Sequence, residues 1–297
     1  MPTLPLRGEP SSEGELDADL AGIDVLDLPL WPAPSLPSRA WSALWPKLAA
    51  IGLFLTVWQT MVWLEWKPTY VLPPPGPVLE RLVSDLGDGV LLTATWITLR
   101  RAVIGYAIAM VIGVTLGLAV ARFRHLRTAL GSLITGLQTM PSIAWFPLAI
   151  LLFQLTEKAI MFVIVLGAAP AIANGLLHGV DHIPPLLLRA GKVLGARGFA
   201  SYRHIVLPAA MPGFVAGMKQ GWAFAWRSLM AGELLVIIAS RPSLGVRLQF
   251  ARELSDAEAL LAAMIVILVI GIVVDAVFFG RLERAIRKRW GLLSSAS

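Results

Sequence analysis

Apolar residues run along most of the chain in long stretches, and polar residues gather in the segments between them. Six stretches approach the roughly 20 residues that an α-helix needs to cross about 30 Å of hydrocarbon. They cover residues 48–66, 102–121, 130–153, 159–177, 213–239 and 259–280. A membrane β-barrel would instead show segments of about ten residues that alternate apolar and polar positions. The pattern predicts an all-α membrane protein with six spanning helices.

Composition agrees with a membrane location. The 297 residues are 57% hydrophobic and 15% charged, and the mean hydropathy is +0.72. The chain has no cysteine, which excludes disulfides, thiolate metal sites and a cysteine nucleophile. Its net charge of +6 is typical of a protein whose cytoplasmic loops collect Lys and Arg. We therefore expect the lipid bilayer as its environment and no nucleic-acid partner.

The same pattern divides the chain into three parts. Residues 1–46 are acidic, rich in proline and without the apolar stretch of a signal peptide, so they are expected to form a disordered tail. Residues 47–290 form the predicted membrane domain, and residues 291–297 form a short C-terminal tail. Within the domain, residues 70–96 combine prolines with helical periodicity, which predicts an interfacial helix between the first two spans.

The positions of Lys and Arg predict the orientation in the membrane. More of them fall on the cytoplasmic side when the N-terminus is placed there. Both termini and the 178–212 loop are then cytoplasmic, and residues 67–98 and 240–258 are external. Arg100 and Arg101 fit this count least well, since they fall on the outer side. They are expected at the headgroup level or inside the protein.

The longest inner loop, about 178–212, is too apolar for a solvated linker, so we expect a partner to cover it. Its residues 189–191, Gly195 and 205–208 reproduce the spacing EAA-x3-G-x9-I-x-L-P, which is the permease signature of ABC importers. Residues 98–101 and 140–148 resemble the branch of that family that imports nitrate, taurine and alkanesulfonates. Two positions differ from the signature: Arg189 stands in place of Glu, and Gly191 stands in place of the second Ala.

The signature predicts a helical hairpin. Gly195 permits a sharp turn between two short helices, and Pro208 is expected to end the second helix before the next span begins. Phe199 and Tyr202 share one helix face and are expected to anchor in a groove of a partner. The resemblance assigns the hairpin to coupling with an ATPase through Ala190, Gly191, Gly195, Phe199, Tyr202, Ile205, Leu207 and Pro208. The alternative is a loop that packs only on its own bundle.

The resemblance extends over roughly residues 45–290 and implies the six-helix permease fold of type I importers. It also implies a bacterial inner membrane, partner ABC ATPase subunits, an extracytoplasmic solute-binding protein and a second permease subunit in a homodimer. Nitrate, taurine and sulfonates are the implied solutes, although the branch also handles some organic cations and vitamin precursors.

The sequence indicates no catalytic centre. Its only Gly-Lys pair, Gly191-Lys192, is followed by Val193, so no G-x4-G-K-[ST] motif exists. We therefore expect no enzyme activity and no cofactor, because ATP would be bound by a partner subunit. His178 and His182 have a spacing that can bind a metal on one helix face. Their place at the end of the fourth span favours polar caps, so we assign no metal.

Charges inside the predicted spans are the candidates for a transport path, because each costs roughly 2.5–3.5 kcal/mol near the bilayer centre. They are Lys219, Arg227, Glu233 and Asp275. Arg227 lies mid-span beside Trp222 and Trp226, and these three residues are assigned to the substrate path. Arg227 either meets an anionic solute or forms a buried ion pair with Asp275 or Glu233. Lys219 is closer to the cytoplasmic interface, which its side chain can reach.

Glycines recur at intervals of four in two spans, at 213, 217 and 221 and at 113 and 117. Such rows allow close helix packing, either within one subunit or between two. Three functional classes remain: an importer permease driven by partner ATPases, a secondary transporter or channel driven by an ion gradient, and an intramembrane enzyme. The coupling hairpin favours the first class over the second, and the scattered His and acidic residues disfavour the third.

Overall fold

The computed structural model describes residues 36–238 and 241–289, in which every regular element is a helix. The chain divides into two units, residues 1–60 and 61–297. The first unit contains most of α2 (Leu36–Trp63), so residues 36–46 are helical and do not belong to a disordered tail. The remainder of the predicted N-terminal tail and the whole predicted C-terminal tail lie outside the described residues.

The second unit contains the remaining elements. They are α3 (Pro75–Gly87), α4 (Val90–Arg122), α5 (Arg124–Thr139), η1 (Ser142–Trp145), α6 (Phe146–Phe153), α7 (Glu157–Asp181), α8 (Pro185–Val193), α9 (Phe199–Ser201), η2 (Tyr202–Val206), α10 (Leu207–Leu235), α11 (Leu244–Glu253), α12 (Ala257–Val273), η3 (Val274–Phe279) and α13 (Gly280–Arg289). Among the described residues, three helices are long and apolar enough to cross a membrane, namely Val90–Arg122, Glu157–Asp181 and Ala257–Ile286. The bent pair of α5 with η1 and α6 would make a fourth crossing. The predicted first and fifth spans overlap α2 and α10 (Leu207–Leu235), which are not among these helices, and α10 carries three charges.

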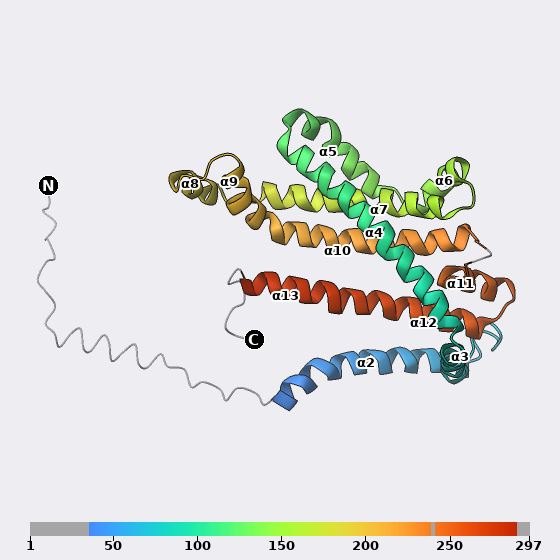
Figure 1. Ribbon diagram of the computed structural model, residues 1–297. Helices are drawn as coiled ribbons and strands as arrows, with labels where there is room; N and C mark the ends of the chain where they lie inside the picture. Colours follow the sequence, from blue (N-terminus) through green and yellow to red (C-terminus); the bar gives the residue numbers. More distant parts are fainter. Residues whose placement is uncertain (1–35, 239–240, 290–297) are drawn as a thin grey trace, which may run out of the picture. The chain divides into compact units, whose positions relative to one another are not determined.

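Helix α7 lies at the centre of the second unit. It runs beside α10, and α4 crosses both helices (Figure 1). Between α7 and α10 the backbones nearly touch, since a Cβ added to Gly175 would lie 2.3 Å from the Cα of Gly217. On the α4 side, a Cβ added to Gly113 would lie 2.6 Å from the carbonyl oxygen of Ala169. The glycine rows therefore pack helices within one chain.

Two predicted spans have different boundaries in the structure. The third, 130–153, is not one straight helix, because α5 and the helical segment 142–153 meet at an angle of 104°. Met140 between them is extended, with φ −72° and ψ 130°, as expected for a residue that precedes proline. The second span is longer than predicted: α4 begins at Val90, and the interfacial helix predicted within 70–96 is confined to α3.

Candidate functional site

The predicted hairpin stands at one end of α7 and α10 (Figure 1). Helix α8 packs against α9 and η2, and the turn between them places Gly195 at φ +83° and Gly198 at φ +52°. Side chains rarely tolerate this left-handed backbone, so both glycines are required by the turn. A Cβ added to Gly191 would lie 1.8 Å from Cδ1 of Ile205. Ile205 therefore occupies the space that an alanine at this position of the signature would need.

Pro208 does not end the second helix of the hairpin, and that prediction is wrong. Elements α9, η2 and α10 follow one another without a break from residue 199 to 235, and we call this segment the α10 rod. Pro208 lies in the first turn of α10, directly after a π turn in which the Leu207 N–H bonds to the Tyr202 carbonyl oxygen. The π turn changes the hydrogen-bond register where proline has no N–H to offer. The hairpin is therefore continuous with α10.

The apolar side chains of the hairpin are exposed. Phe199 is 79% exposed and Tyr202 is 48% exposed. Both residues line a cavity of about 540 Å³ together with residues of α4, α7 and the start of α10. The other predicted coupling residues lie around them: Ala190, Gly195 and Leu207 are exposed, Ile205 and Pro208 are half-buried, and Gly191 is buried. This surface is open to a partner, and its contact with an ATPase stays a prediction.

The predicted path residues line a cleft between α10 and the C-terminal helical segment. The cleft has a volume of about 520 Å³ and is lined by Trp222, Trp226 and Arg227. The two tryptophan rings stack, with centroids 6.1 Å apart and planes at 18°. Trp222 is only 9% exposed, so it is mainly a core residue, and its ring meets Tyr106 edge-on at 5.3 Å. Trp226 and Arg227 therefore supply most of the accessible surface of the three.

Arg227 is exposed and forms no ion pair with any residue that the structure describes. Its Nε donates to the carbonyl oxygen of Ala223 at 3.1 Å, and its guanidinium lies 4.8 Å from the centroid of the Phe224 ring. The two acids considered as its partners, Asp275 and Glu233, are paired with other cations. The ion-pair interpretation is therefore wrong for both acids. The charge of Arg227 remains available to a ligand.

Lys219 is the partner of Asp275. Its Nζ lies 3.1 Å from Oδ1 of Asp275 and 3.5 Å from Oε1 of Glu283. Lys219, Asp275 and Glu283 lie on α10, η3 and α13 and line the same cleft as Arg227. The charge of Lys219 is thus neutralised by two acids, whereas the charge of Arg227 is not. Lys219 makes these contacts instead of extending alone to the membrane surface.

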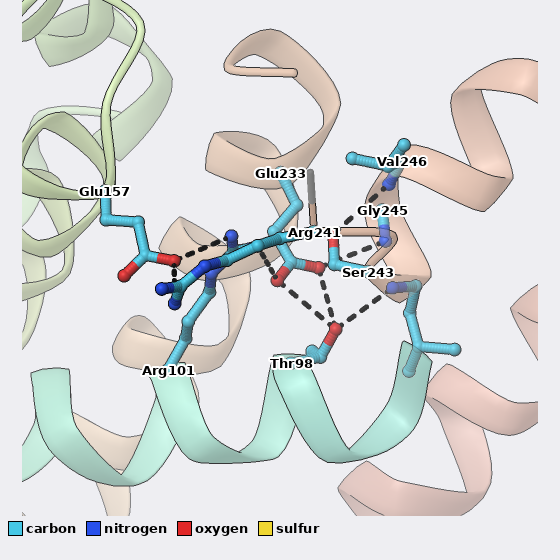
Figure 2. A network of polar contacts seen from close by, with 9 residues as sticks. Thr98, Arg101, Glu157, Glu233, Arg241, Ser243, Gly245 and Val246 are labelled. Carbon is cyan, nitrogen blue, oxygen red and sulfur yellow. Dashed lines mark hydrogen bonds and ion pairs between the residues drawn. The ribbon is translucent and has the colours of Figure 1, made fainter. Parts of the chain in front are cut away.

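A polar node with a buried centre lies at the other end of the α10 rod. It consists of Thr98, Arg101, Glu157, Glu233 and Arg241, and Figure 2 shows these side chains converging. Arg101 donates from Nη1 to Oε1 of Glu233 at 3.0 Å and from Nη2 to Oε1 of Glu157 at 3.1 Å. Arg241 donates to the same Glu157 oxygen at 2.7 Å. Arg101 is 4% exposed, and Thr98 and Glu233 are fully buried.

Glu233 also holds the first turn of α11. The Gly245 N–H donates to Oε2 of Glu233 at 3.1 Å, and the Thr98 hydroxyl donates to the same oxygen at 2.9 Å. Thr98 Oγ1 in turn accepts from the Leu244 N–H at 3.0 Å. A carboxylate at a helix N-terminus satisfies free N–H groups and is favoured by the helix dipole. A Cβ added to Gly245 would lie 2.3 Å from Cβ of Glu233, so only glycine allows this approach.

Sequence reasoning found parts of the node but not the node itself. It singled out Glu233 as a charge within a span and Arg101 as a base that could lie inside the protein, and the structure confirms the interior position of Arg101. Their partnership spans 132 positions of the sequence. The available signal was that each is an intramembrane charge without a local partner, which predicts a distant one.

The two histidines of interest lie at the C-terminal end of α7. His182 is the C-cap residue of α7, and its Nδ1 lies 2.8 Å from the carbonyl oxygen of His178. In the described part of the chain, no three His, Cys, Asp or Glu residues gather as ligands of a metal would. The geometry agrees with the predicted polar cap.

Comparisons with known proteins identify the family. Residues 87–288 match the family described as binding-protein-dependent transport system inner membrane component. The chain is 29% identical over 252 residues to the taurine transport system permease protein TauC of Escherichia coli, covering 81% of this chain and 90% of that protein. It is 26% identical over 238 residues to the nitrate import permease protein NrtB of Synechocystis, covering 76% of this chain and 83% of that protein.

A solved structure has the same fold. The inward-facing MetNI methionine ABC transporter contains a chain that matches with a TM-score of 0.56 and 19% identity, over 66% of this chain and 95% of that chain. Because the family match covers most of its length, this chain belongs to the inner membrane components of binding-protein-dependent transport systems. The resemblance drawn from the hairpin signature and the predicted permease fold are confirmed.

Proposed function

We propose that the chain is the permease subunit of an ATP-driven importer and that it moves a small anionic solute of the sulfonate, taurine or nitrate type. The solute passes along the cleft beside α10. In this proposal ATP is hydrolysed by partner ABC ATPase subunits, an extracytoplasmic binding protein delivers the solute, and a second copy of the chain completes the path. The complex lies in a bacterial inner membrane with both termini in the cytoplasm.

Arg227 carries the proposal for an anion. It is exposed on the cleft without an acidic partner among the described residues, whereas Lys219 in the same cleft is neutralised. A guanidinium offers two parallel N–H donors, which suit the planar or tetrahedral oxygens of nitrate and sulfonate. The half-buried Trp226 beside it provides an apolar wall for an organic portion of the solute. These features together suit a small organic oxyanion.

The exposed hairpin is an argument for a partner ATPase. Phe199 and Tyr202 offer apolar surface at the end of a helix that continues unbroken into the cleft wall. Exposed aromatic residues of this kind are typical anchors of a protein interface. A transporter driven by an ion gradient needs no cytoplasmic ATPase and therefore does not require an exposed aromatic surface on this hairpin.

Uptake into proteoliposomes tests the solute and the role of Arg227. Arg227→Gln should lower uptake of a sulfonate by about tenfold or more, because a desolvated charge that meets an anion contributes roughly 2–5 kcal/mol. Arg227→Lys should retain part of the uptake, and Arg252→Gln, an exposed arginine outside the cleft, serves as the matched control. Uptake of an organic cation or a vitamin precursor in preference to every anion would refute the anionic solute.

The energy source and the orientation need separate tests. Uptake should require ATP together with the ATPase subunit and should survive collapse of the proton gradient.

The protein has no native cysteine, so Ser201→Cys on the hairpin and Leu254→Cys after α11 report on which side of the membrane each segment lies. Impermeant reagents applied outside intact cells should label Leu254→Cys only. Labelling of Ser201→Cys under these conditions would reverse the orientation.

A further inference from the structure

The α10 rod connects the hairpin to the polar node. It runs without a break from Phe199 in the hairpin to Leu235, two residues beyond Glu233. At about 1.5 Å per residue it is roughly 55 Å long. A displacement of the hairpin therefore reaches Glu233 through continuous helix. What moves with that end depends on the bonds that Glu233 makes.

The bonds of Glu233 join the rod to α11. Its carboxylate accepts from the Gly245 N–H at 3.1 Å, and Thr98 bridges the same carboxylate to the Leu244 N–H. Arg101 supplies the countercharge at 3.0 Å. All of these groups are buried, and hydrogen bonds to a buried charge are among the strongest that a protein makes. The rod cannot slide past α11 without breaking them.

Helix α11 lines a groove that adjoins the cleft containing Arg227. A groove of about 630 Å³ lies between α10, α11 and α12, and Gly245 and Leu248 of α11 line it. This groove shares Trp226, Gly271 and Asp275 with the cleft that contains Arg227. The two cavities therefore adjoin, and a shift of α11 relative to α12 would move one of the walls of the groove.

We propose that Thr98, Arg101 and Glu233 are positioning residues that make α11 follow the α10 rod, so that motion at the hairpin widens or narrows the groove between α11 and α12. The node would thus convert movement at the hairpin into gating at the opposite end of the path. The inference rests on the proposed function for its direction of transport, and on the geometry of the node for the motion itself.

Two variants separate this role from simple stability. Thr98→Val removes only the bridging hydroxyl and keeps the shape of the side chain, and Thr98→Ser is the matched control that keeps the hydroxyl. Arg101→Met with Glu233→Met removes both charges together, which avoids the unpaired buried charge that a single replacement would leave. The double methionine variant fills the space of both side chains without their charges. Any measured property that depends only on the stability of the fold should therefore stay close to that of the native protein.

The readout is the distance between spin labels in the complex with its ATPase. One label pair joins Leu235→Cys at the end of α10 to Val269→Cys on α12, and the other joins Phe250→Cys on α11 to Val269→Cys. All three positions are exposed, and the native chain has no cysteine. In the otherwise native protein both distances should shift together when ATP is bound. In the double methionine variant only the α10 distance should still shift. In Thr98→Val, where the bond from the Gly245 N–H to Glu233 remains, the α11 distance should shift less than in the native protein.

The expected functional result is a fall in uptake of about tenfold or more at unchanged ATP hydrolysis, with Thr98→Ser close to the native protein. Two results would overturn the proposal: an α11 distance that still follows ATP in the double methionine variant, or an α11 distance that never shifts in the native protein. A wrong solute assignment is distinguishable, because it removes uptake of anions by the native protein and leaves both ATP-dependent distance shifts in place.

Discussion

The two ends of the α10 rod differ in how their surfaces are satisfied. At the hairpin end, Phe199 and Tyr202 expose aromatic surface, and the turn depends on glycines with left-handed backbone. At the node end, Glu233 and Thr98 are fully buried, and the carboxylate is hydrogen-bonded by donors from two other helices. The node end is completed within the chain, whereas the hairpin end is left open and is covered by an ATPase only in the proposed function. Mutations at the two ends should therefore change different measured quantities.

The largest effect is expected from breaking the node. Glu233→Leu removes the buried partner of Arg101 and leaves it only the contact with the partly exposed Glu157. Removing one member of a buried ion pair destabilises a fold by about 3–5 kcal/mol. The melting temperature of the protein in detergent should fall sharply. Adding Arg101→Met should recover much of the loss. Glu253→Leu, at an exposed position of α11, is the control. Equal melting temperatures of Glu233→Leu and Glu253→Leu would show that the buried ion pair does not stabilise the node end.

At the hairpin end, Phe199→Asp should leave the melting temperature of the isolated chain nearly unchanged, because the side chain is exposed. Binding of the ATPase subunit should weaken by about 2 kcal/mol or more, as is typical for loss of an aromatic anchor. Co-purification and titration of the ATPase measure this. Val83→Asp on α3 is a matched control, since Val83 is also an exposed apolar residue. Normal ATPase binding by Phe199→Asp would refute the assignment of the hairpin to the interface with the ATPase.

The contrast also explains what the sequence could predict. The hairpin is local: its glycines, aromatics and proline lie within twenty residues, so their spacing is visible in one stretch of sequence. The node joins Thr98 and Arg101 to Glu233 across more than 130 positions, and a single sequence does not state such pairings. Hydropathy predicted a helical segment at each span, and three of the described helices are long and apolar enough to cross a membrane. It did not show the 104° turn after Met140, which depends on the backbone preference of one residue before proline.

A smaller effect is expected within the hairpin itself. Gly191→Ala places a Cβ where Cδ1 of Ile205 now lies, and overpacking of this kind costs about 1–3 kcal/mol. Ile205→Val removes Cδ1 and should therefore relieve the strain, so the double variant should melt like the native protein. Gly136→Ala on α5, where a Cβ meets nothing within 4 Å, is the control. Additive losses in the double variant would show that the two residues do not share this space.

The smallest effect is expected at the cap of α11, because the node already holds that helix. Ser243 Oγ accepts from the Val246 N–H at 3.5 Å, and the preceding N–H groups of the helix bond to Thr98 and Glu233. Ser243→Ala should therefore lower stability by less than the typical cap contribution of about 1 kcal/mol.

Asp256→Ala is the comparison for this cap. Asp256 caps α12 by accepting from the Ala259 N–H at 3.0 Å, and it also pairs with Arg81 at 3.1 Å, so its loss should lower stability more. Chemical denaturation of the two variants in the same detergent measures the difference. A larger loss in Ser243→Ala than in Asp256→Ala would mean that the node does not fix the start of α11, and the rigid connection between the rod and α11 would then lack its structural basis.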